Sequence, residues 1–280
     1  MRTITGHARL AGVMGWPIAH SRSPRLHGFW LAKHDIDGAY LPLAVRPANL
    51  ASALKALPVL GFAGVNITLP HKAAALGLVD RASEEAQRIG AVNTVVVGAD
   101  GLLEGSNTDG YGFLAHLRAA APAWRPDAPV VLLGAGGAAR AIAVALLETG
   151  VPELRLANRT VGRTAELAAA LGPKLKPVDW AQRNDALHGA GLLVNSTTLG
   201  MAGQPALEIS LRRLPRTAVV YDIVYVPLET PLLAAARARG HATVDGLGML
   251  LHQALPGFAA WFGVTPDVTA DLREFVLAAI

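Results

Sequence analysis

The feature that most constrains this chain is a run in which an apolar strand leads through glycines into a helix. Residues 130–140 read VVLLGAGGAAR: four apolar residues, a glycine-rich turn, and a helical pattern that starts at Gly137. Short apolar runs alternate with helical patterns in the same way along the rest of the chain. This alternation is typical of a mostly parallel α/β architecture, in which helices cross between neighbouring strands. We therefore expect an α/β fold.

A proline-rich connection divides the chain. Residues 121–129 (APAWRPDAP) contain three prolines, which makes them a stiff link. The pattern before the link predicts strands at residues 10–15, 39–45, 62–68, 92–97 and 102–105, and helices at 24–33, 47–57, 70–78 and 109–120. The pattern after it predicts strands at 130–133, 154–157, 192–195 and 218–222, and helices from 137 and at 161–171, 231–239, 248–262 and 266–279. We therefore expect two domains.

Composition narrows the classes of function. With 52% hydrophobic and 16% charged residues the chain can bury a real core, which excludes intrinsic disorder. The absence of cysteine excludes disulfides, thiolate metal sites and cysteine nucleophiles. The net charge of +4 comes without a basic block, so we do not expect a nucleic-acid partner. No run approaches the ~18 apolar residues of a membrane span and no signal peptide is recognised, so we expect a soluble, cytoplasmic protein.

The glycine turn also predicts a ligand. Gly134 permits a tight turn, and Gly136 lets a pyrophosphate approach the backbone at the helix N-terminus. The sixth position of the dinucleotide fingerprint is Ala139, which the fingerprint tolerates. An ordinary tight turn between a strand and a helix would also use these glycines. Because this turn lies between a strong strand and a strong helix, we interpret residues 134–138 as a dinucleotide site.

The end of the next strand indicates which dinucleotide is bound. An NAD site usually has an acid there, which holds the ribose 2′-hydroxyl. This chain instead has Asn158-Arg159-Thr160, followed by Arg163. A guanidinium suits a 2′-phosphate, and cations at a helix N-terminus oppose the helix dipole unless they bind an anion. We therefore predict NADP(H) as the cofactor, and the missing acid also argues against an adenosylmethionine methyltransferase.

Polar residues stand at helix starts and strand ends in the first domain. Ser23 as the N-cap of a helix, with Pro24 as its first residue, would be standard helix-start chemistry, which leaves Ser21 unexplained. Asn66 and Thr68 are two apart and therefore share one face of a strand.

Further polar residues follow in the same pattern. Lys72 falls in the first turn of a helix, where a cation is unfavourable, and a surface lysine is the alternative interpretation. Asn93 puts an amide into an apolar strand, and Asp109 precedes a helix that it would otherwise merely cap. Open α/β sheets bind ligands at such strand ends and helix starts, so together these residues predict a ligand site. His20, His27 and His71 lack the spacing of a metal site, and we expect no metal.

An ordered set of motifs runs through the chain. In the first domain these are residues 17–24 (PIAHSRSP), 66–72 (NITLPHK), 90–94 (GAVNT) and 107–110 (NTDG). They continue with 134–138 (GAGGA), 158–160 (NRT), 195–197 (NST), 200–201 (GM), 221–225 (YDIVY), 230–232 (TPL) and 245–250 (DGLGML). In this order and completeness the set resembles the shikimate dehydrogenase family.

The resemblance implies the reversible NADPH-dependent reduction of 3-dehydroshikimate to shikimate, a step of aromatic amino-acid biosynthesis. It implies a substrate-binding domain with a mixed sheet over residues 1–108 and 246–280, and a Rossmann-like NADP-binding domain over 109–245. The residues that it places at the substrate are Ser21, Ser23, Thr68, Lys72, Asn93, Asp109, Tyr225 and Gln253. Those that it places at the cofactor are Gly134, Ala135, Gly136, Gly137, Ala138, Asn158, Arg159, Thr160 and Arg163, with Ile223, Gly246 and Met249 at the nicotinamide end.

The resemblance makes Lys72 and Asp109 the catalytic pair. A nearby carboxylate favours the charged form of a lysine, so we expect Lys72 to donate a hydrogen bond and a proton to the developing alkoxide. Asp109 would orient it. Two alternatives are a quinate/shikimate dehydrogenase of broader specificity and a catalytically silent NADP-binding regulator. The arginines at 159 and 163 argue against a preference for NAD, and the presence of both catalytic residues argues against the regulator. A homodimer is left open.

Overall fold

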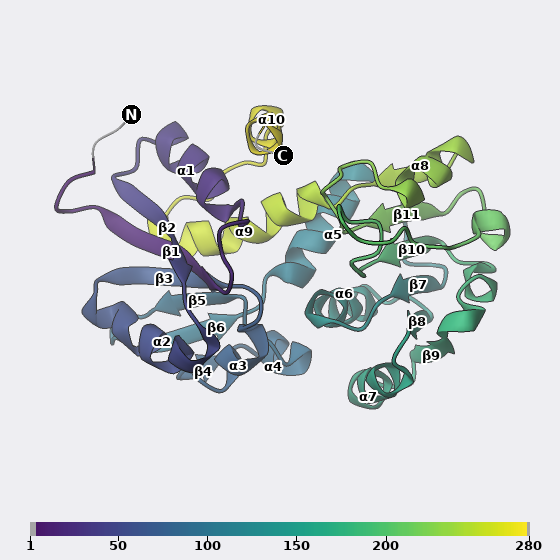
Figure 1. Ribbon diagram of the computed structural model, residues 1–280, viewed down its shortest axis with the longest axis horizontal. Coiled ribbons are helices and arrows are strands. Elements are labelled where there is room, and N and C mark those ends of the chain that lie inside the picture. The colour runs from purple at the N-terminus through teal and green to yellow at the C-terminus, as the bar shows by residue number, and fades with distance from the viewer. Residues whose placement is uncertain (1–3, 279–280) are drawn as a thin grey trace. The chain divides into compact units, whose positions relative to one another are not determined.

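The computed structural model describes residues 4–278, which divide into two compact units. Unit 1 comprises the residues up to Thr108 together with those from Gln253 onward, and unit 2 comprises Asp109–His252. The chain thus returns to unit 1 within a helix, after His252, whereas the resemblance places the boundary at residue 246. Figure 1 labels the elements of both units.

Unit 1 is built on a mixed six-stranded sheet. Its strands are β1 (Arg9–Gly15), β2 (Gly38–Ala44), β3 (Phe62–Ile67), β4 (Arg81–Ala82), β5 (Thr94–Val97) and β6 (Leu103–Ser106), in the order β2-β1-β3-β5-β6-β4. β1 lies parallel to β2 and β3, while β5 is antiparallel to β3. The carboxyl ends of β1 and β3 are therefore at the same edge of the sheet as the amino end of β5.

Helices cover both faces of this sheet. They are α1 (Ser23–Lys33), η1 (Pro47–Asn49), α2 (Leu50–Val59), α3 (Lys72–Leu76), α4 (Glu84–Ile89), the second part of α9 (Leu247–Phe262) and α10 (Ala270–Leu277). On β3, Val65 and Ile67 belong to the apolar cluster that contains Leu54 of α2. On the opposite face Gly64 leaves room for Trp261 of α9, since a Cβ at residue 64 would lie 2.2 Å from the indole nitrogen. That nitrogen donates to the carbonyl of Val95 over 3.0 Å.

Unit 2 is a doubly wound parallel sheet. Its strands are β7 (Val130–Leu133), β8 (Leu154–Asn158), β9 (Leu175–Asp179), β10 (Leu192–Asn195), β11 (Val219–Asp222) and β12 (Ala242–Val244), in the order β12-β11-β10-β7-β8-β9. From β7 the chain steps outward to β8 and β9, then returns to place β10 on the other side of β7. This is the Rossmann order, and its topological switch point lies between β7 and β10.

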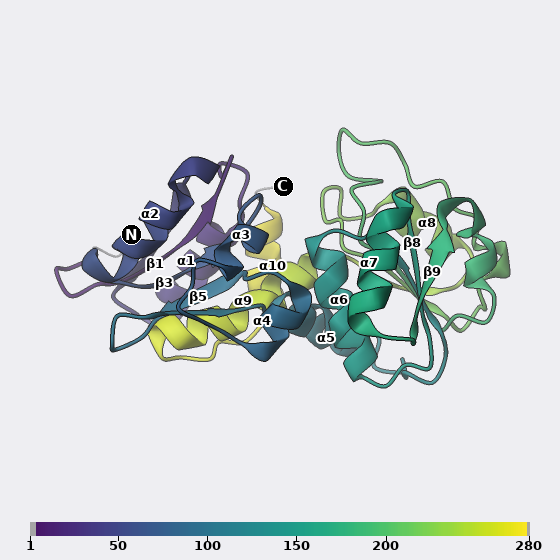
Figure 2. The same cartoon turned by 90° about the horizontal axis from the view of Figure 1, so that it is seen from below.

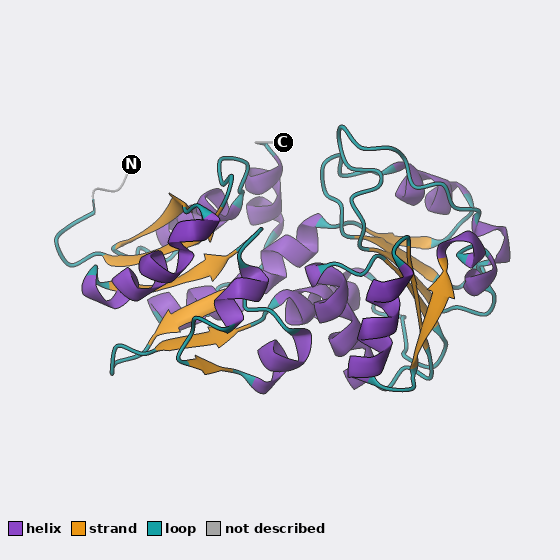
Figure 3. Cartoon of the chain, turned by 60° about the horizontal axis from the view of Figure 1, so that its bottom comes forward, coloured by secondary structure: helices purple, strands orange, loops and turns teal. Residues whose placement is uncertain are grey.

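Both faces of the parallel sheet are buried. The covering elements are α5 (Asp109–Ala120), α6 (Gly137–Glu148), α7 (Val161–Leu171), η2 (Trp180–Gln182), η3 (Asp185–Leu187), η4 (Leu211–Arg213), α8 (Pro231–Ala238) and the start of α9. On β7, Leu132 packs in one apolar cluster with Ile142 of α6, and Leu133 packs in another with Leu233 of α8. Figure 2 shows α7 beside β8 and β9, and Figure 3 shows helices in purple flanking the orange strands.

The expected α/β class, with one mixed and one Rossmann-like parallel sheet, is confirmed. Three expected helices differ from the observed ones by more than two residues: residues 47–49 form a 3₁₀ turn before α2, α3 covers only Lys72–Leu76, and α10 starts at Ala270. The predicted end of that last helix, Ala279, lies outside the described residues. β4, α4, β9 and β12 were not predicted from the sequence; they are short or lie at sheet edges.

Candidate functional site

A cavity of about 200 Å³ lies at the switch point of the unit 2 sheet. Its lining residues follow four neighbouring strands, β7, β8, β9 and β10. They are Gly134, Ala135, Gly136, Asn158, Arg159, Trp180, Ser196, Thr197, Thr198 and Leu199. Open α/β sheets bind ligands in this position, because the loops diverge where the strand order reverses. The cavity is therefore a candidate ligand site by topology alone.

The glycine turn fits a pyrophosphate. Gly134 has φ +103°, a region that favours glycine, and a Cβ there would lie 2.8 Å from the hydroxyl of Ser196. Beside it, a Cβ at Gly136 or Gly137 would meet nothing within 4 Å, so the approach to the N-terminus of α6 is open. No side chain caps α6 and no acid lies in its first turn. Its first N–H groups can therefore serve an anion.

The end of β8 fits a second anionic group. The side chain of Asn158 donates to the carbonyl of Thr160 over 3.1 Å, which shapes the turn into α7. Arg159 and Arg163 are exposed on either side of the start of α7, and the first turn of that helix has no acid. Two cations at a helix N-terminus favour a phosphate ligand. The structure thus places the open N-terminus of α6 and the two exposed arginines on one edge of the sheet.

A buried hydrogen-bond network joins the two loops that follow β10 and β11. Asp222 accepts from the side chains of Asn195 (2.9 Å) and Thr230 (2.7 Å) and from the N–H of Val224 (3.1 Å). Burial raises the pKa of Asp222 to about 6, against the effect of these hydrogen bonds. Asn195 also accepts from the hydroxyl of Thr197 over 2.7 Å. The network therefore fixes the wall of the cavity relative to the loop that starts at Ile223.

The residues expected at the nicotinamide end lie in that loop and at the start of α9. Gly246 packs against the loop so closely that a Cβ would lie 2.0 Å from the carbonyl oxygen of Ile223. Met249 is 8% exposed and belongs to the main apolar cluster, against which Ile223 also packs. Core packing is thus an observed role of Met249. Tyr225 is half-buried two residues beyond Ile223.

In unit 1, the structure contradicts the interpretation of Ser23 as a helix cap. α1 begins at Ser23 itself, with Arg22 at the N-cap position and no side chain capping the helix. The hydroxyl of Ser21 accepts from the N–H of Ser23 over 3.3 Å, which lets the helix start one residue earlier than expected. Ser23 is 8% exposed and lies close to the phenol of Tyr40.

Tyr40 is the first member of a buried hydrogen-bond network that continues on β3 and β5. Burial raises the pKa of Tyr40 well above its usual range, so the phenol stays protonated, and its hydroxyl donates to Asn66 Oδ1 over 2.6 Å. Asn66 Nδ2 donates to the carbonyl of Asn93 and to the hydroxyl of Thr94, each over 3.2 Å. Because a carbonyl only accepts, the orientation of the Asn66 amide is fixed.

The network continues to the helix α9. Asn93 Oδ1 accepts from the hydroxyl of Thr94 and from the N–H of Thr108, each over 2.9 Å. The hydroxyl of Thr108 donates to the carbonyl of Gln253 over 2.8 Å. Asn93, which interrupts an apolar stretch in the sequence, is therefore held by a chain of hydrogen bonds that starts at Tyr40.

The remaining candidates follow β3 and β6. Thr68 directly follows β3, and a Cβ at Gly15 would lie 2.5 Å from its methyl group, so the glycine makes room for it. Lys72 is the half-buried first residue of α3, and its carbonyl accepts from the N–H of Val92 over 2.9 Å. Asp109, 6% exposed, is the first residue of α5 and belongs to unit 2. The structure thus brings the candidates other than Asp109 and Tyr225 to one edge of the unit 1 sheet.

Three family models match the chain in succession. Residues 13–95 match the shikimate dehydrogenase substrate binding domain, residues 122–224 match shikimate/quinate 5-dehydrogenase, and residues 246–273 match the shikimate 5′-dehydrogenase C-terminal domain. A curated shikimate dehydrogenase (NADP(+)) from Paramagnetospirillum magneticum is 61% identical over 98% of this chain and 100% of its own length. The chain belongs to the shikimate dehydrogenase family.

Solved structures of shikimate dehydrogenases and related enzymes have the same fold. The shikimate 5-dehydrogenase of Thermus thermophilus, in complex with NADP(H) and shikimate, has a TM-score of 0.87 and 39% identity, and covers 97% of this chain and 100% of that chain. The quinate dehydrogenase of Corynebacterium glutamicum, in complex with NAD, has a TM-score of 0.90 and 36% identity, and the match covers 97% of this chain and 99% of that chain. Enzymes that differ in substrate and cofactor thus share this fold, so the choice between them depends on individual residues.

Several residues that line the unit 2 cavity or support the unit 1 candidates were not predicted as site residues. Trp180 and Ser196 to Leu199 line the cavity, and Tyr40, Thr94 and Thr108 support Asn93. The motif at 195–197 marked part of this set. Trp180 directly follows β9, and because that strand was not predicted, the sequence offered no indication of Trp180.

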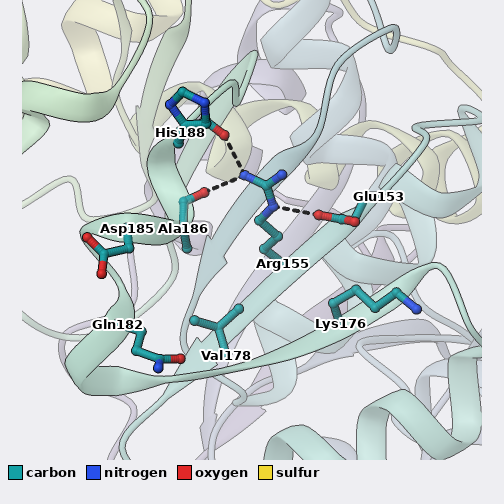
Figure 4. Close-up of a pocket in the computed structure, with 8 residues that line it drawn as sticks. All are labelled: Glu153, Arg155, Lys176, Val178, Gln182, Asp185, Ala186 and His188. Carbon is teal, nitrogen blue, oxygen red and sulfur yellow. Dashed lines mark hydrogen bonds and ion pairs between the residues drawn. The ribbon is translucent and has the colours of Figure 1, made fainter.

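A larger cavity of about 430 Å³ lies elsewhere on unit 2 (Figure 4). It is formed near the amino ends of β8 and β9, whereas the candidate site is at their carboxyl ends. Arg155 lines this cavity, and the guanidinium of Arg155 donates to Glu153 and to the carbonyls of Ala186 and His188. Because these protein acceptors already engage three of its N–H groups, this arginine serves the local fold rather than an anionic ligand.

Among residues 4–278, no group of three or more His, Asp or Glu side chains is arranged to hold a metal ion. Within the same range, none of the helices has both the length and the apolar character needed to cross a membrane.

His27 is an unusual buried group in unit 1. It is 0% exposed, and its ring stacks on Tyr40 with the centroids 3.9 Å apart. Within the described part of the chain, neither ring nitrogen has a hydrogen-bond partner. Burial lowers the pKa of His27 to about 3. The folded protein therefore keeps this ring neutral.

We predict that His27 makes the protein sensitive to acid. Between about pH 6.5 and about pH 3 the unfolded chain binds a proton that the folded protein excludes, so the free energy of unfolding falls by about 1.4 kcal/mol per pH unit as the pH drops. His27→Phe keeps an aromatic ring on Tyr40 and removes this dependence. The measurement is denaturant unfolding of both proteins from neutral pH downward. The control is His34→Gln, at the exposed end of the same helix, which should keep the wild-type slope of the free energy of unfolding against pH. Equal slopes for the wild type and His27→Phe would contradict the prediction.

Proposed function

We propose that this chain catalyses the reversible reduction of 3-dehydroshikimate to shikimate, with NADPH as the reductant, as a step of aromatic amino-acid biosynthesis. The observation that carries the proposal is the 61% identity, over 98% of the chain, to a shikimate dehydrogenase (NADP(+)). The catalytic and binding residues of the motifs are present in this chain, which argues against a catalytically silent regulator. Unit 1 is the proposed substrate-binding domain and unit 2 the proposed NADP-binding domain.

In unit 1, the proposal assigns the substrate carboxylate to Ser21 and Ser23. The hydroxyl of Ser23 is not used for capping, which supports this role. Asn93 is proposed to bind a ring hydroxyl, and its own side-chain oxygen is held by hydrogen bonds from Thr94 and Thr108. Thr68 and Gln253 are proposed to hold further hydroxyls, together with Asp109 and Tyr225 from unit 2. Hydroxyls and amides suit this task because they bind neutral ring hydroxyls in both directions.

In unit 2, the proposal assigns the pyrophosphate of NADPH to the turn Gly134–Ala138 and the 2′-phosphate to Asn158, Arg159, Thr160 and Arg163. The open N-terminus of α6 and the exposed arginines support this assignment. When bound, the cofactor supplies the hydride for the carbonyl carbon. Ile223, Gly246 and Met249 are proposed to border the nicotinamide end, in a loop that the Asn195–Asp222 pair holds in place.

Lys72 is proposed to complete the reaction at the carbonyl oxygen. As hydride arrives at the carbon, negative charge develops on the oxygen, and the ammonium of Lys72 stabilises it by donating a hydrogen bond and then the proton. Asp109 is proposed to orient Lys72. In the oxidation of shikimate the same lysine takes up the proton of the hydroxyl. A cytoplasmic location and a homodimer remain predictions beside this mechanism.

The proposal is tested by adding 3-dehydroshikimate to the purified protein with NADPH. We expect NADPH to be consumed in equal amount to the shikimate that is formed. No turnover by a folded protein, or turnover to another product, would overturn the proposal.

We predict that Arg159→Ala weakens the use of NADPH and leaves the use of NADH nearly unchanged, because only NADPH carries the 2′-phosphate. Loss of a hydrogen bond between charged groups corresponds to an increase of about 10- to 150-fold in the KM for NADPH. Steady-state kinetics with both cofactors measures it. Arg212→Ala removes an exposed arginine elsewhere on unit 2 and should change neither KM. An equal loss with both cofactors would contradict the assignment of Arg159.

A further inference from the structure

The proposed function gives no role to Trp180, a side chain that lines the cavity at the carboxyl ends of β7 to β10. It is the first residue of η2 and directly follows β9. Within the described residues it is the single aromatic side chain that lines this cavity. The other lining residues are glycines, small polar residues, one arginine, one alanine and one leucine. Trp180 therefore offers the cavity's one flat π surface.

The strand register places Trp180 beside Arg159. β8 and β9 run parallel, with Asn158 opposite Asp179. Arg159 and Trp180 are the next residues on the two strands, so both leave the sheet at the same level. Arg159 is the proposed partner of the 2′-phosphate. In an adenosine 2′-phosphate the base is attached to the ribose carbon next to the one that carries the phosphate. The group that reaches Trp180 is then the purine.

Trp180 is held in place from several sides. Its side chain packs against the apolar cluster that contains Leu187 and Leu193. The guanidinium carbon of Arg183 lies 4.9 Å from the centre of a ring of the indole, and the same guanidinium donates to the carbonyl of Trp180 over 2.7 Å. Asp179 caps η2 by accepting from the N–H of Ala181 over 2.8 Å. A side chain that is fixed before binding loses little conformational freedom on binding.

We propose that Trp180 is a further cofactor-binding residue, on whose indole the adenine base of NADPH stacks. The inference rests on the proposed function, because it takes the ligand to be an adenosine 2′-phosphate. Stacking needs only an aromatic face and the π surface of the base, and it makes no demand on hydrogen-bond geometry. The polar lining of the cavity then holds the phosphates, while Trp180 holds the base.

The proposal is tested by direct binding of adenosine 2′,5′-bisphosphate, which carries the base and the 2′-phosphate but lacks nicotinamide. Calorimetry on the wild type, Trp180→Leu, Trp180→Phe and Trp124→Leu gives the four dissociation constants. We expect Trp180→Leu to bind about 5- to 150-fold more weakly, the range that loss of one base–aromatic stack produces. Trp180→Phe keeps an aromatic face and should retain most of the affinity. Trp124 is partly buried in another apolar cluster of the same unit, so Trp124→Leu should bind like the wild type.

Tryptophan fluorescence gives a second readout that does not depend on Trp180→Leu being folded. We expect the bisphosphate to quench the fluorescence of the wild type and of Trp124→Leu, and to leave that of Trp180→Phe unchanged. Equal affinities for the wild type and a folded Trp180→Leu, or quenching that persists in Trp180→Phe, would overturn the proposed role of Trp180 and leave the proposed function standing. A folded wild type that binds neither the bisphosphate nor NADPH would instead overturn the proposed function.

Discussion

Lys72→Ala is expected to lower kcat for 3-dehydroshikimate by about 10²- to 10⁴-fold, the range that a positioned proton donor contributes. The lysine helps most when charge has developed on the oxygen, so the loss falls on kcat rather than on KM. The KM should change only a few-fold, because Ser21, Ser23 and Asn93, which we propose as substrate-binding residues, are unchanged in this variant. Steady-state kinetics at saturating NADPH measures both constants, after a thermal melt confirms that the variant is folded.

Two further variants sharpen this prediction. Asp109→Asn should also lower kcat, and the double variant should lose less than the product of the two single losses, because the pair acts as a unit. Lys55→Ala is the matched control, since Lys55 is an exposed lysine on α2 of the same unit. A Lys72→Ala enzyme that keeps kcat within about tenfold of the wild type would assign the proton to another group.

The second large effect is expected in the choice of substrate. Shikimate should be preferred over quinate by at least about 10²-fold in kcat/KM, measured in the direction of oxidation. Quinate carries an extra hydroxyl on a tetrahedral carbon beside the carboxylate and needs more room next to Ser21 and Ser23. Ser23 is nearly buried and lies close to the phenol of Tyr40, so the protein leaves it little room to move aside.

The comparison of shikimate with quinate also tests the main alternative, a quinate/shikimate dehydrogenase of broader specificity. The fold cannot do so, because a quinate dehydrogenase in complex with NAD has a TM-score of 0.90 with this chain. Comparable kcat/KM values for shikimate and quinate, measured with the same enzyme preparation and cofactor, would place the protein with the enzymes of broader specificity.

Strongly apolar strands and well-bounded helices could be predicted from the sequence. Residues 130–133, 161–171 and 192–195 form β7, α7 and β10 with the expected bounds, because buried strands and amphipathic helices carry distinct periodicities. β9 could not be predicted in this way, since it is an edge strand with exposed Lys176 and Pro177 in its middle. Because β9 was not predicted, Trp180 was not recognised as a residue at a strand end.

The candidate site could be predicted as a set of residues but not as a set of contacts. Asn195 and Asp222 both occur in recognised motifs, yet their hydrogen bond depends on β10 and β11 being neighbours, and local sequence does not encode strand order. For Ser23, local sequence rules were misleading. They predicted that Ser23 caps α1, but the helix starts at Ser23 itself and no side chain caps it. The N–H of Ser23 instead donates to the hydroxyl of Ser21.

The central claim is that this chain moves a hydride from NADPH to a ring carbonyl carbon and a proton to its oxygen. The most direct test is one turnover reaction with 3-dehydroshikimate and NADPH deuterated at the transferable position of the nicotinamide ring, followed by mass and NMR analysis of the product. The account predicts shikimate with one deuterium on the carbon that carried the carbonyl. Product without deuterium at that carbon, or no product from a folded enzyme, would contradict it.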